Sequence, residues 1–395
     1  MTPLISNEIL QKSRKVLFIT HLAIGDFVYL SMFFEEFARQ NPHLEIHIWV
    51  DEIRRTRCFW RWKLLRNYSL YQWLEQCWFF KKVYSKTYRP KMYKESIAVA
   101  RQENYDLVVS LATLRPDQYA VLARAIGGKK SFVVGIARKC SWYCFLKRFR
   151  FKKLSASIAA KAPGSIHVTD TYAYWFQELF GLVLSAEQRF PKIQIPNVWL
   201  LFAKLRLLMW QFDKKSNSFN RVFFINAYAK VNKRTWSLAS VAQLITMLKK
   251  QDMWNDFHFI VNVPPEYYVK AVSYFKKYAT PSVIVFSAKE NFFQLPAMIK
   301  ICDVIISVET AVMHLAAAFD RPMVVLMRQK NPEWAPLTKA PCRIVTTQKR
   351  KQWICDVPVQ QVYDSVDQLL TELAFKREVE SVEPAPLGGE IIGSP

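Results

Sequence analysis

The sequence has few glycines, no paired cysteine spacing and no long apolar run, and these absences exclude several classes of protein. Only nine of the 395 residues are glycine. The seven cysteines are an odd number without paired spacing, so we expect reduced thiols in a cytoplasmic protein rather than a disulfide scaffold. No stretch reaches the roughly 18 consecutive apolar residues of a membrane span. The N-terminus lacks the apolar region of a signal peptide, so none is expected.

Acidic residues are also scarce, and the resulting charge indicates an anionic partner. The chain has 56 Lys and Arg against 32 Asp and Glu, a formal net charge of +24. Of these, residues 1–212 hold 33 basic and 15 acidic residues, so the basic surface belongs mainly to the first half. A phospholipid surface, a phosphorylated substrate or nucleic acid would fit this charge. Nucleic acid is not the expected partner, because no nucleic-acid-binding module is recognisable.

Short apolar strands alternate with helical patterns along the whole chain. Strands are predicted at 15–20, 44–50, 106–111, 131–136, 221–226, 257–263, 282–287, 303–308 and 323–327. Helices are predicted at 27–40, 117–126, 237–250, 266–278, 291–301 and 311–319. This alternation predicts an α/β fold with parallel sheets covered on both faces. We expect an N-terminal domain over 1–190, a linker over 191–220, a C-terminal domain over 221–375 and a disordered tail over 376–395.

Residues 54–94 form a basic and aromatic insertion in the first domain. They contain twelve basic residues and one acid, interleaved with aromatic residues, among them Trp60, Trp73 and Trp78. This composition suits the interface of an anionic membrane, where rings lie at headgroup depth and lysines meet phosphates. The alternative is a solvated helical face over ordinary core aromatics.

Ligands of parallel α/β sheets bind at the carboxyl ends of the strands, and three such ends carry polar groups. The first is THLAIGDFVYL at 20–30, where Asp26 lies near the first turn of a helix. Asp26 could cap that helix. The functional alternative is a general base that takes the proton of an attacking sugar hydroxyl, although a Gly-Asp pair alone favours the cap.

The second end is NAYAKVNKRTWSL at 226–238, which carries Lys230, Lys233 and Arg234. Cations and free N–H groups at a helix entrance suit a diphosphate. The segment has no glycine-rich phosphate fingerprint, however, so an exposed basic loop is an equal alternative.

The third end is SVETAVMHLAAAFDRP at 307–322. Glu309 and Thr310 follow a strand, and the N–H groups of 311–313 would open the next helix and could hold nucleotide phosphates. His314, on the first turn, could donate to one of their oxygens. Alternatively, Thr310 is an N-cap and His314 a packed core histidine.

At these residues the sequence resembles the ADP-heptose:lipopolysaccharide heptosyltransferases, glycosyltransferase family 9. The similar segments run in order along most of the chain, and the most specific is SVETAVMHLAAAFDRPMVVLM, which resembles an Asp-Thr-Gly-x-x-His-Leu-Ala-Ala-Ala signature. The others are KVLFITHLAIGDFVYLSMFFEEFARQNP, NYDLVVSLATL, LARAIGGKKSFVVGI, HVTDTYAYWFQELFGL and FFINAYAKVNKRTWSL.

The resemblance implies a GT-B arrangement, in which two Rossmann-like domains with parallel sheets face each other across a cleft. The acceptor would bind the N-terminal domain and the nucleotide sugar the C-terminal domain. Asp26 would deprotonate the acceptor hydroxyl, Lys233 would contact the donor phosphates or heptose, and Glu266 would meet the ribose. The heptose and diphosphate would be lined by Glu309, Thr310, Ala311, Val312 and His314.

The implied reaction is an inverting, metal-independent transfer of heptose from ADP-L-glycero-D-manno-heptose to Kdo or heptose of the lipopolysaccharide inner core. No cofactor is expected. The acceptor would be a lipid A-linked core oligosaccharide, with the enzyme cytoplasmic and peripheral on the inner face of the inner membrane. By charge and placement, the candidate acceptor residues are Arg54, Arg55, Arg57, Arg89, Lys91, Arg115 and Arg138.

The sequence departs from the family pattern in the donor half. Glu309 stands where Asp is usual, Ala311 replaces a glycine, and Arg328 follows a strand after which the family has a glycine. These departures keep two alternatives open. One is a related transferase with another nucleotide sugar or a protein acceptor, and the other is a non-catalytic protein that binds anionic surfaces on the same fold.

Overall fold

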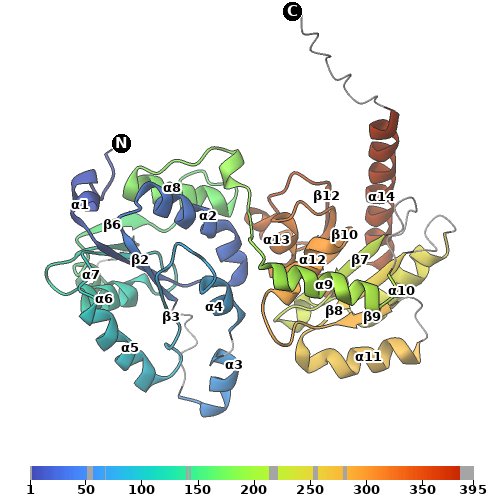
Figure 1. The fold of residues 1–395 in the computed structure, drawn as a ribbon, viewed down its shortest axis with the longest axis horizontal. Helices are drawn as coiled ribbons and strands as arrows, with labels where there is room; N and C mark the ends of the chain where they lie inside the picture. Colours follow the sequence, from blue (N-terminus) through green and yellow to red (C-terminus); the bar gives the residue numbers. More distant parts are fainter. Residues whose placement is uncertain are drawn as a thin grey trace, which may run out of the picture.

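The chain forms two α/β domains, each built on a six-stranded parallel sheet (Figure 1). The computed structural model describes residues 2–50, 57–66, 68–138, 141, 144–212, 221–251, 257–278 and 283–382. The sheet orders are β3-β2-β1-β4-β5-β6 and β12-β11-β10-β7-β8-β9. Counted from the first strand of each domain, both follow the order 3-2-1-4-5-6 of the dinucleotide-binding fold. The predicted fold class is therefore confirmed.

The N-terminal domain alternates strands and helices up to residue 180. Its strands are β1 Lys15–Thr20, β2 Glu45–Val50, β3 Lys82–Tyr84, β4 Leu107–Ser110, β5 Phe132–Ala137 and β6 Ala156–Ala159. Its helices are α1 Asn7–Lys12, α2 Ile24–Gln40, α3 Trp62–Arg66, α4 Ser69–Leu74, α5 Pro90–Gln102, α6 Pro116–Gly127, α7 Phe145–Phe151 and α8 Val168–Phe180.

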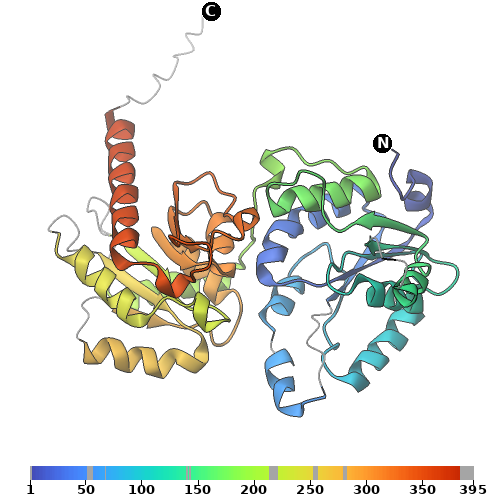
Figure 2. The same ribbon diagram turned by 180° about the vertical axis from the view of Figure 1, so that it is seen from behind.

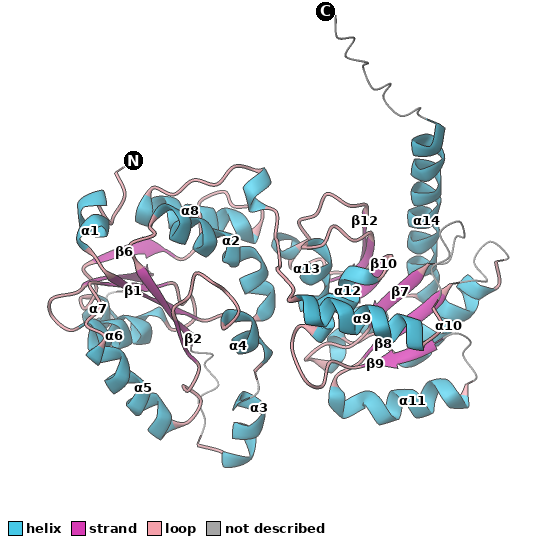
Figure 3. Ribbon diagram, in the orientation of Figure 1, coloured by secondary structure: helices cyan, strands magenta, loops and turns pink. Residues whose placement is uncertain are grey.

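The C-terminal domain repeats this alternation. Its strands are β7 Val222–Asn226, β8 His258–Asn262, β9 Val283–Phe286, β10 Val304–Val308, β11 Met323–Met327 and β12 Cys342–Thr346. Its helices are α9 Asn197–Met209, α10 Leu238–Lys249, α11 Tyr268–Lys277, α12 Gln294–Ile301, α13 Ala311–Ala317 and α14 Val359–Val382. Both sheets carry helices on both faces (Figure 3).

The two faces of each sheet bury different apolar clusters, because successive side chains of a strand point to opposite sides. In β1, Val16 and Phe18 pack with α2 and α8, whereas Leu17 and Ile19 belong to the cluster under α5 and α6. The cluster on the α2 side continues through α12 and α13 of the other domain. One apolar core therefore joins the two domains.

The nine predicted strands are present with small shifts at their ends, but three were not predicted. These three are β3, β6 and β12. Each is an edge strand, paired with one neighbouring strand only. β3 has three residues, β6 is ASIA, and Ile344 in β12 is exposed. Such strands lack the buried β-branched run that identifies a central strand.

Helices also occupy parts of the predicted linker and tail. Within 191–220, α9 packs against α12 and so belongs to the C-terminal domain. Its Ala203 and Leu207 are buried, and this apolar composition explains why the segment folds as a helix. α14 continues to Val382, past the predicted boundary at 375, and 383–395 lie outside the described residues.

The basic and aromatic insertion divides between core and surface. Tyr71, Trp73, Phe79 and Phe80 are buried, as the core alternative required. Three other aromatic side chains are exposed, namely Phe59, Trp60 and Trp78. No helix among the described residues is long and apolar enough to cross a membrane.

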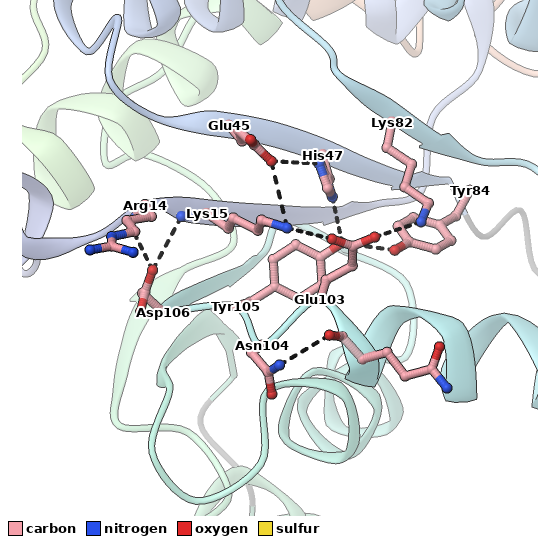
Figure 4. A network of polar contacts seen from close by, with 11 residues as sticks. Arg14, Lys15, Glu45, His47, Lys82, Tyr84, Glu103, Asn104, Tyr105 and Asp106 are labelled. Atoms are coloured by element: carbon pink, nitrogen blue, oxygen red, sulfur yellow. Dashed lines mark hydrogen bonds and ion pairs between the residues drawn. The ribbon is translucent and has the colours of Figure 1, made fainter.

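A polar network lies at the amino ends of β1, β2 and β3 (Figure 4). The Glu103 carboxylate accepts hydrogen bonds from Lys15 Nζ and Lys82 Nζ, both at 2.7 Å, and these bonds lower its pKa to about 2. His47 Nδ1 lies 2.7 Å from the Tyr105 hydroxyl, which in turn lies 2.8 Å from the Tyr84 hydroxyl. Burial lowers the pKa of His47 to about 4, so its ring is neutral near pH 7.

This network predicts a loss of stability in mild acid. Because the folded-state pKa of His47 is about 4 and its unfolded value is 6.5, the unfolded chain binds the extra proton between these pH values. The unfolding free energy should therefore fall as pH is lowered from 7 to 5, by on the order of 2 kcal/mol from His47 alone. Urea unfolding of wild type and His47→Gln at both pH values would measure it. The variant should show a smaller change between the two pH values, and an equal change would remove His47 from this role.

Candidate active site between the domains

The carboxyl ends of the two sheets meet at the domain boundary. α2 follows β1, α13 follows β10, and these two helices pack against each other. A cavity of about 880 Å³ lies between the domains. Ile24, Tyr68 and Gln72 line it from one side, and Glu266 and Phe292 line it from the other. The predicted arrangement of sheets facing across a cleft is thus present.

Asp26 lies in the first turn of α2, one residue after Gly25, which approaches His314 of the other domain. Its Oδ2 accepts a hydrogen bond from the Ala23 N–H at 2.9 Å, so it caps the helix. Its Oδ1 accepts a second hydrogen bond from the Tyr172 hydroxyl on α8, at 3.2 Å. Burial raises the pKa of the Asp26 carboxyl, and the two hydrogen bonds offset part of that rise. A carboxylate that is both held in place and made more basic suits proton abstraction.

His314 is buried at the contact between α13 and α2. Its Nδ1 lies 2.9 Å from the Tyr29 hydroxyl, which also accepts a hydrogen bond from the Leu337 N–H at 3.2 Å. Burial lowers the pKa of His314 to about 3, so the ring is neutral near pH 7. The packed-histidine alternative describes this position, and contact of His314 with a donor oxygen stays a prediction.

His167 makes a second bridge between the domains from the N-cap of α8. Its Nδ1 accepts a hydrogen bond from the Thr169 N–H at 3.2 Å. Its Nε2 therefore carries the proton and donates to the Ala335 carbonyl oxygen at 2.9 Å. Both His167 and Tyr172 belong to the HVTDTY segment that supported the family resemblance, but neither was predicted as a site residue.

Gly25 allows the two domains to approach closely. A Cβ at this position would lie 2.9 Å from His314 Cδ2, which is closer than real Cβ contacts. The requirement for glycine here comes from the neighbouring domain rather than from the turn itself.

Thr310 belongs to a polar group at the carboxyl ends of β7, β8 and β10. Its Oγ1 accepts from the Val312 N–H at 3.4 Å and so caps α13. Asn226 donates to the same oxygen at 3.0 Å and accepts from Asn262 at 2.8 Å. Asn226 and Asn262 were not predicted as site residues. Each ends a buried apolar strand, and this position could have identified them from the sequence.

Glu309 is buried and bound by three donors. Asn331 Nδ2 lies 2.6 Å from its Oε1, Arg328 Nε lies 3.3 Å from its Oε2, and Arg234 pairs with it at 3.7 Å. Two of the departures from the family pattern, Glu309 and Arg328, are therefore coupled through direct contact.

A donor-side basic cluster consists of Lys233, Arg234 and Arg328, and two of its members lie against Trp353. Lys233 Nζ lies 5.4 Å and Arg328 Cζ 5.2 Å from the Trp353 ring centre. Lys233 is exposed, whereas Arg234 is half-buried. Cations gathered at the carboxyl end of a sheet can neutralise a diphosphate.

The other predicted donor residues lie nearby. Glu266 is exposed on the cavity wall. Ala311 is half-buried and Val312 is buried at the start of α13. Among the residues that the structure describes, no group of three or more His, Cys, Asp or Glu side chains could hold a metal ion.

The predicted acceptor residues fall into separate groups. Arg115 and Arg138 line one pocket of about 580 Å³ together with Lys147 and Arg150, which we call the α6–α7 pocket. Arg89 lines another pocket of about 460 Å³, and its guanidinium carbon lies 4.0 Å from the Trp62 ring centre. Arg57 and Lys91 are exposed outside both pockets, and Arg54 and Arg55 lie outside the described residues.

Comparison with known proteins agrees with this geometry. Residues 204–357 match glycosyltransferase family 9 (heptosyltransferase). A glycosyl transferase family 9 structure from Veillonella parvula DSM 2008 is 16% identical with a TM-score of 0.68, covering 91% of this chain and 97% of that one. No curated protein sequence matches the chain.

Two E. coli enzymes share the fold at similar identity. ADP-heptose lps heptosyltransferase II is 13% identical with a TM-score of 0.62, covering 91% of this chain and 99% of its own. Heptosyltransferase WaaC with ADP is 12% identical with a TM-score of 0.60, covering 90% of this chain and 99% of its own.

The chain therefore has the two-domain fold of these glycosyltransferases. Residues 204–357 form a glycosyltransferase family 9 (heptosyltransferase) domain, which confirms the resemblance that the motifs indicated.

The close contact between Gly25 and His314 gives a stability prediction. Gly25→Ala should lower the unfolding free energy by about 1–3 kcal/mol, because the new methyl group forces the His314 ring aside. Helix propensity alone predicts the opposite sign, a gain of roughly 0.5–1 kcal/mol. Thermal and urea unfolding would decide between them.

The matched test adds His314→Ala to Gly25→Ala. Removing the ring removes the clash, so the double variant should be less destabilised than the two single effects added together. Additive effects, or a more stable Gly25→Ala protein, would contradict this contact.

Proposed function

We propose that this protein is an inverting heptosyltransferase that moves heptose from ADP-L-glycero-D-manno-heptose to Kdo or heptose of the lipopolysaccharide inner core. The observation that carries the proposal is the placement of Asp26. Its basic carboxylate lies one residue from Gly25, which contacts His314 of the donor domain. The relatives of the same fold include heptosyltransferases solved with ADP and with ADP-2-deoxy-2-fluoro heptose, which supports the choice of donor.

In the proposed reaction, Asp26 takes the proton of the acceptor hydroxyl as its oxygen attacks the anomeric carbon. The new carbon–oxygen bond forms on the face opposite the ADP, so the configuration inverts as the bond to the diphosphate breaks. The negative charge that develops on the leaving ADP is neutralised by Lys233, Arg234 and Arg328 without a metal. In this arrangement Tyr172 holds the Asp26 carboxylate in position through its hydroxyl.

The donor would lie along the carboxyl end of the second sheet. Glu266 would bind the ribose, Lys233 the phosphates, and the segment 309–314 the heptose and diphosphate. Because Glu309 is held by Arg328, its contribution to sugar binding would depend on this pair. Because this pair departs from the family pattern, it also favours a second candidate function, a transferase that uses a different nucleotide sugar. A thermal-shift panel of nucleotide sugars would distinguish the two donors, since the bound one raises the unfolding temperature.

The acceptor side would use the basic pockets of the N-terminal domain. The α6–α7 pocket and the Arg89 pocket would hold acidic groups of a lipid A-linked core oligosaccharide. Such an acceptor places the enzyme in the cytoplasm, peripheral on the inner face of the inner membrane.

The central test is Asp26→Asn, measured as ADP release from ADP-heptose with a lipid A–Kdo acceptor. Turnover should fall by roughly 10²–10⁴-fold, because the amide cannot accept the proton. Donor binding, measured by thermal shift, should be retained. Asp170→Asn is the matched control, since Asp170 Oδ2 accepts from the His167 N–H at 2.9 Å in the same capping geometry on α8. Equal losses in the two variants would assign Asp26 to capping alone.

A second test concerns the hydrogen bond from Tyr172 to Asp26. Tyr172→Phe removes a donor that stabilises the carboxylate, so the pKa of Asp26 should rise further. The acid limb of the kcat/KM profile should move to higher pH, because the base must be deprotonated. Tyr174→Phe, a half-buried tyrosine on the same helix, is the control. An unmoved limb would remove Tyr172 from this role.

A further inference from the structure

Helix α7 presents an apolar surface to solvent on the N-terminal domain. Phe145, Leu146 and Phe149 expose 68%, 59% and 60% of their surface. The helix lies toward the end of this domain that is farthest from the C-terminal domain, in both Figure 1 and the reverse view of Figure 2. Large aromatic side chains are rarely left in water as a group, and such a patch typically marks an interaction site.

The two sides of α7 have different surroundings. Lys147, Arg150 and Phe151 line the α6–α7 pocket. Phe145, Leu146 and Phe149 are not among the residues that line it and form the exposed side. These spacings place the two groups on separate sides of a helix with 3.6 residues per turn. The exposed side and the pocket are therefore separated by about the width of one helix.

The charge around this exposed side selects its partner. Residues 145–153 contain five basic residues and no acid. Lys152 and Lys153 follow the helix and are exposed, and Lys153 Nζ lies 5.1 Å from the Phe149 ring centre. Aromatic side chains flanked by lysine and arginine fit the headgroup region of an anionic bilayer, where rings enter the interface and cations meet phosphates.

We propose that the exposed side of α7, namely Phe145, Leu146 and Phe149 with Lys152 and Lys153, docks the N-terminal domain on an anionic lipid bilayer. Docking in this way would hold the α6–α7 pocket near the bilayer surface, on the other side of one helix. The reason for such a position, access to a lipid-anchored acceptor, rests on the proposed function. The docking surface itself stands on exposure and charge.

Helix α9 provides an internal comparison. It exposes a longer apolar stripe on the other domain, made of Val198, Leu201, Leu205, Leu208 and Met209. Within 197–209 only Lys204 and Arg206 are basic. If exposed apolar area alone bound lipid, α9 would bind more strongly than α7. If the combination of rings and cations is required, α7 dominates.

The test is binding of the full-length protein to lipid vesicles, measured by co-sedimentation without donor or acceptor. Wild type should bind phosphatidylglycerol-containing vesicles, and more weakly at high salt or with pure phosphatidylcholine. The triple variant Phe145→Ser, Leu146→Ser, Phe149→Ser should bind at least about tenfold more weakly, because its apolar contact with the bilayer is lost. The matched variant Leu201→Ser, Leu205→Ser, Leu208→Ser should bind as wild type does. Thermal unfolding would verify that both variants are folded.

Several results would overturn this proposal. They are absence of wild-type binding to anionic vesicles, an equal or larger loss in the α9 variant, and full retention in a folded α7 variant. A wild-type dimer that the α7 substitutions convert to monomer would assign the surface to contact between two copies of the chain. Vesicle binding is measured without turnover. If the wild-type protein binds vesicles but has no transferase activity, that result contradicts the proposed function and leaves the docking surface supported.

Discussion

The arrangement of the site depends on a close contact between Gly25 in the first turn of α2 and the His314 ring on α13. This contact is possible because the glycine has no side chain and because the Tyr29 hydroxyl fixes the ring at Nδ1. It brings the helix that carries Asp26 against the helix that follows the donor-side strand. The apolar cluster shared by α2, α8, α12 and α13 surrounds it. A close packing contact, with its ring held by one hydrogen bond, thus sets the approach of the helix that carries the proposed base to the donor segment.

The departures from the family pattern form a connected group in space. Glu309 and Arg328 are partners, and Arg328 shares the Trp353 ring with Lys233. A glycine at 328 could not have supplied this cation, and a shorter acid at 309 would have met it differently. The altered residues therefore keep a buried carboxylate satisfied while they add positive charge around the expected diphosphate position. We expect this change to affect donor recognition rather than the fold.

The central strands and the strand-end positions of the site could be predicted from the sequence, because buried β-branched runs such as KVLFIT and MVVLM have few other structural solutions. The edge strands β3, β6 and β12 could not, since they are short or half-exposed. Asp26, Thr310 and Lys233 were proposed as site residues from the polar residues that follow strands, and their roles stay predictions. The partners Tyr29, Tyr172 and Asn331 were not, because their pairing depends on contacts between segments far apart in the chain.

Helix α9 has a consequence for how the two domains are connected. Because it packs on α12, the segment that passes between the domains is confined to residues 181–196, after α8 and before α9. The described chain makes this passage once, so any rotation of one domain against the other would be centred there. His167 caps α8 at the end away from this segment, and its bond to Ala335 joins the two domains directly. Opening of the cleft would then require separation of the apolar contacts that α2 shares with α12 and α13 and the breaking of a few hydrogen bonds, but not the unfolding of a shared element.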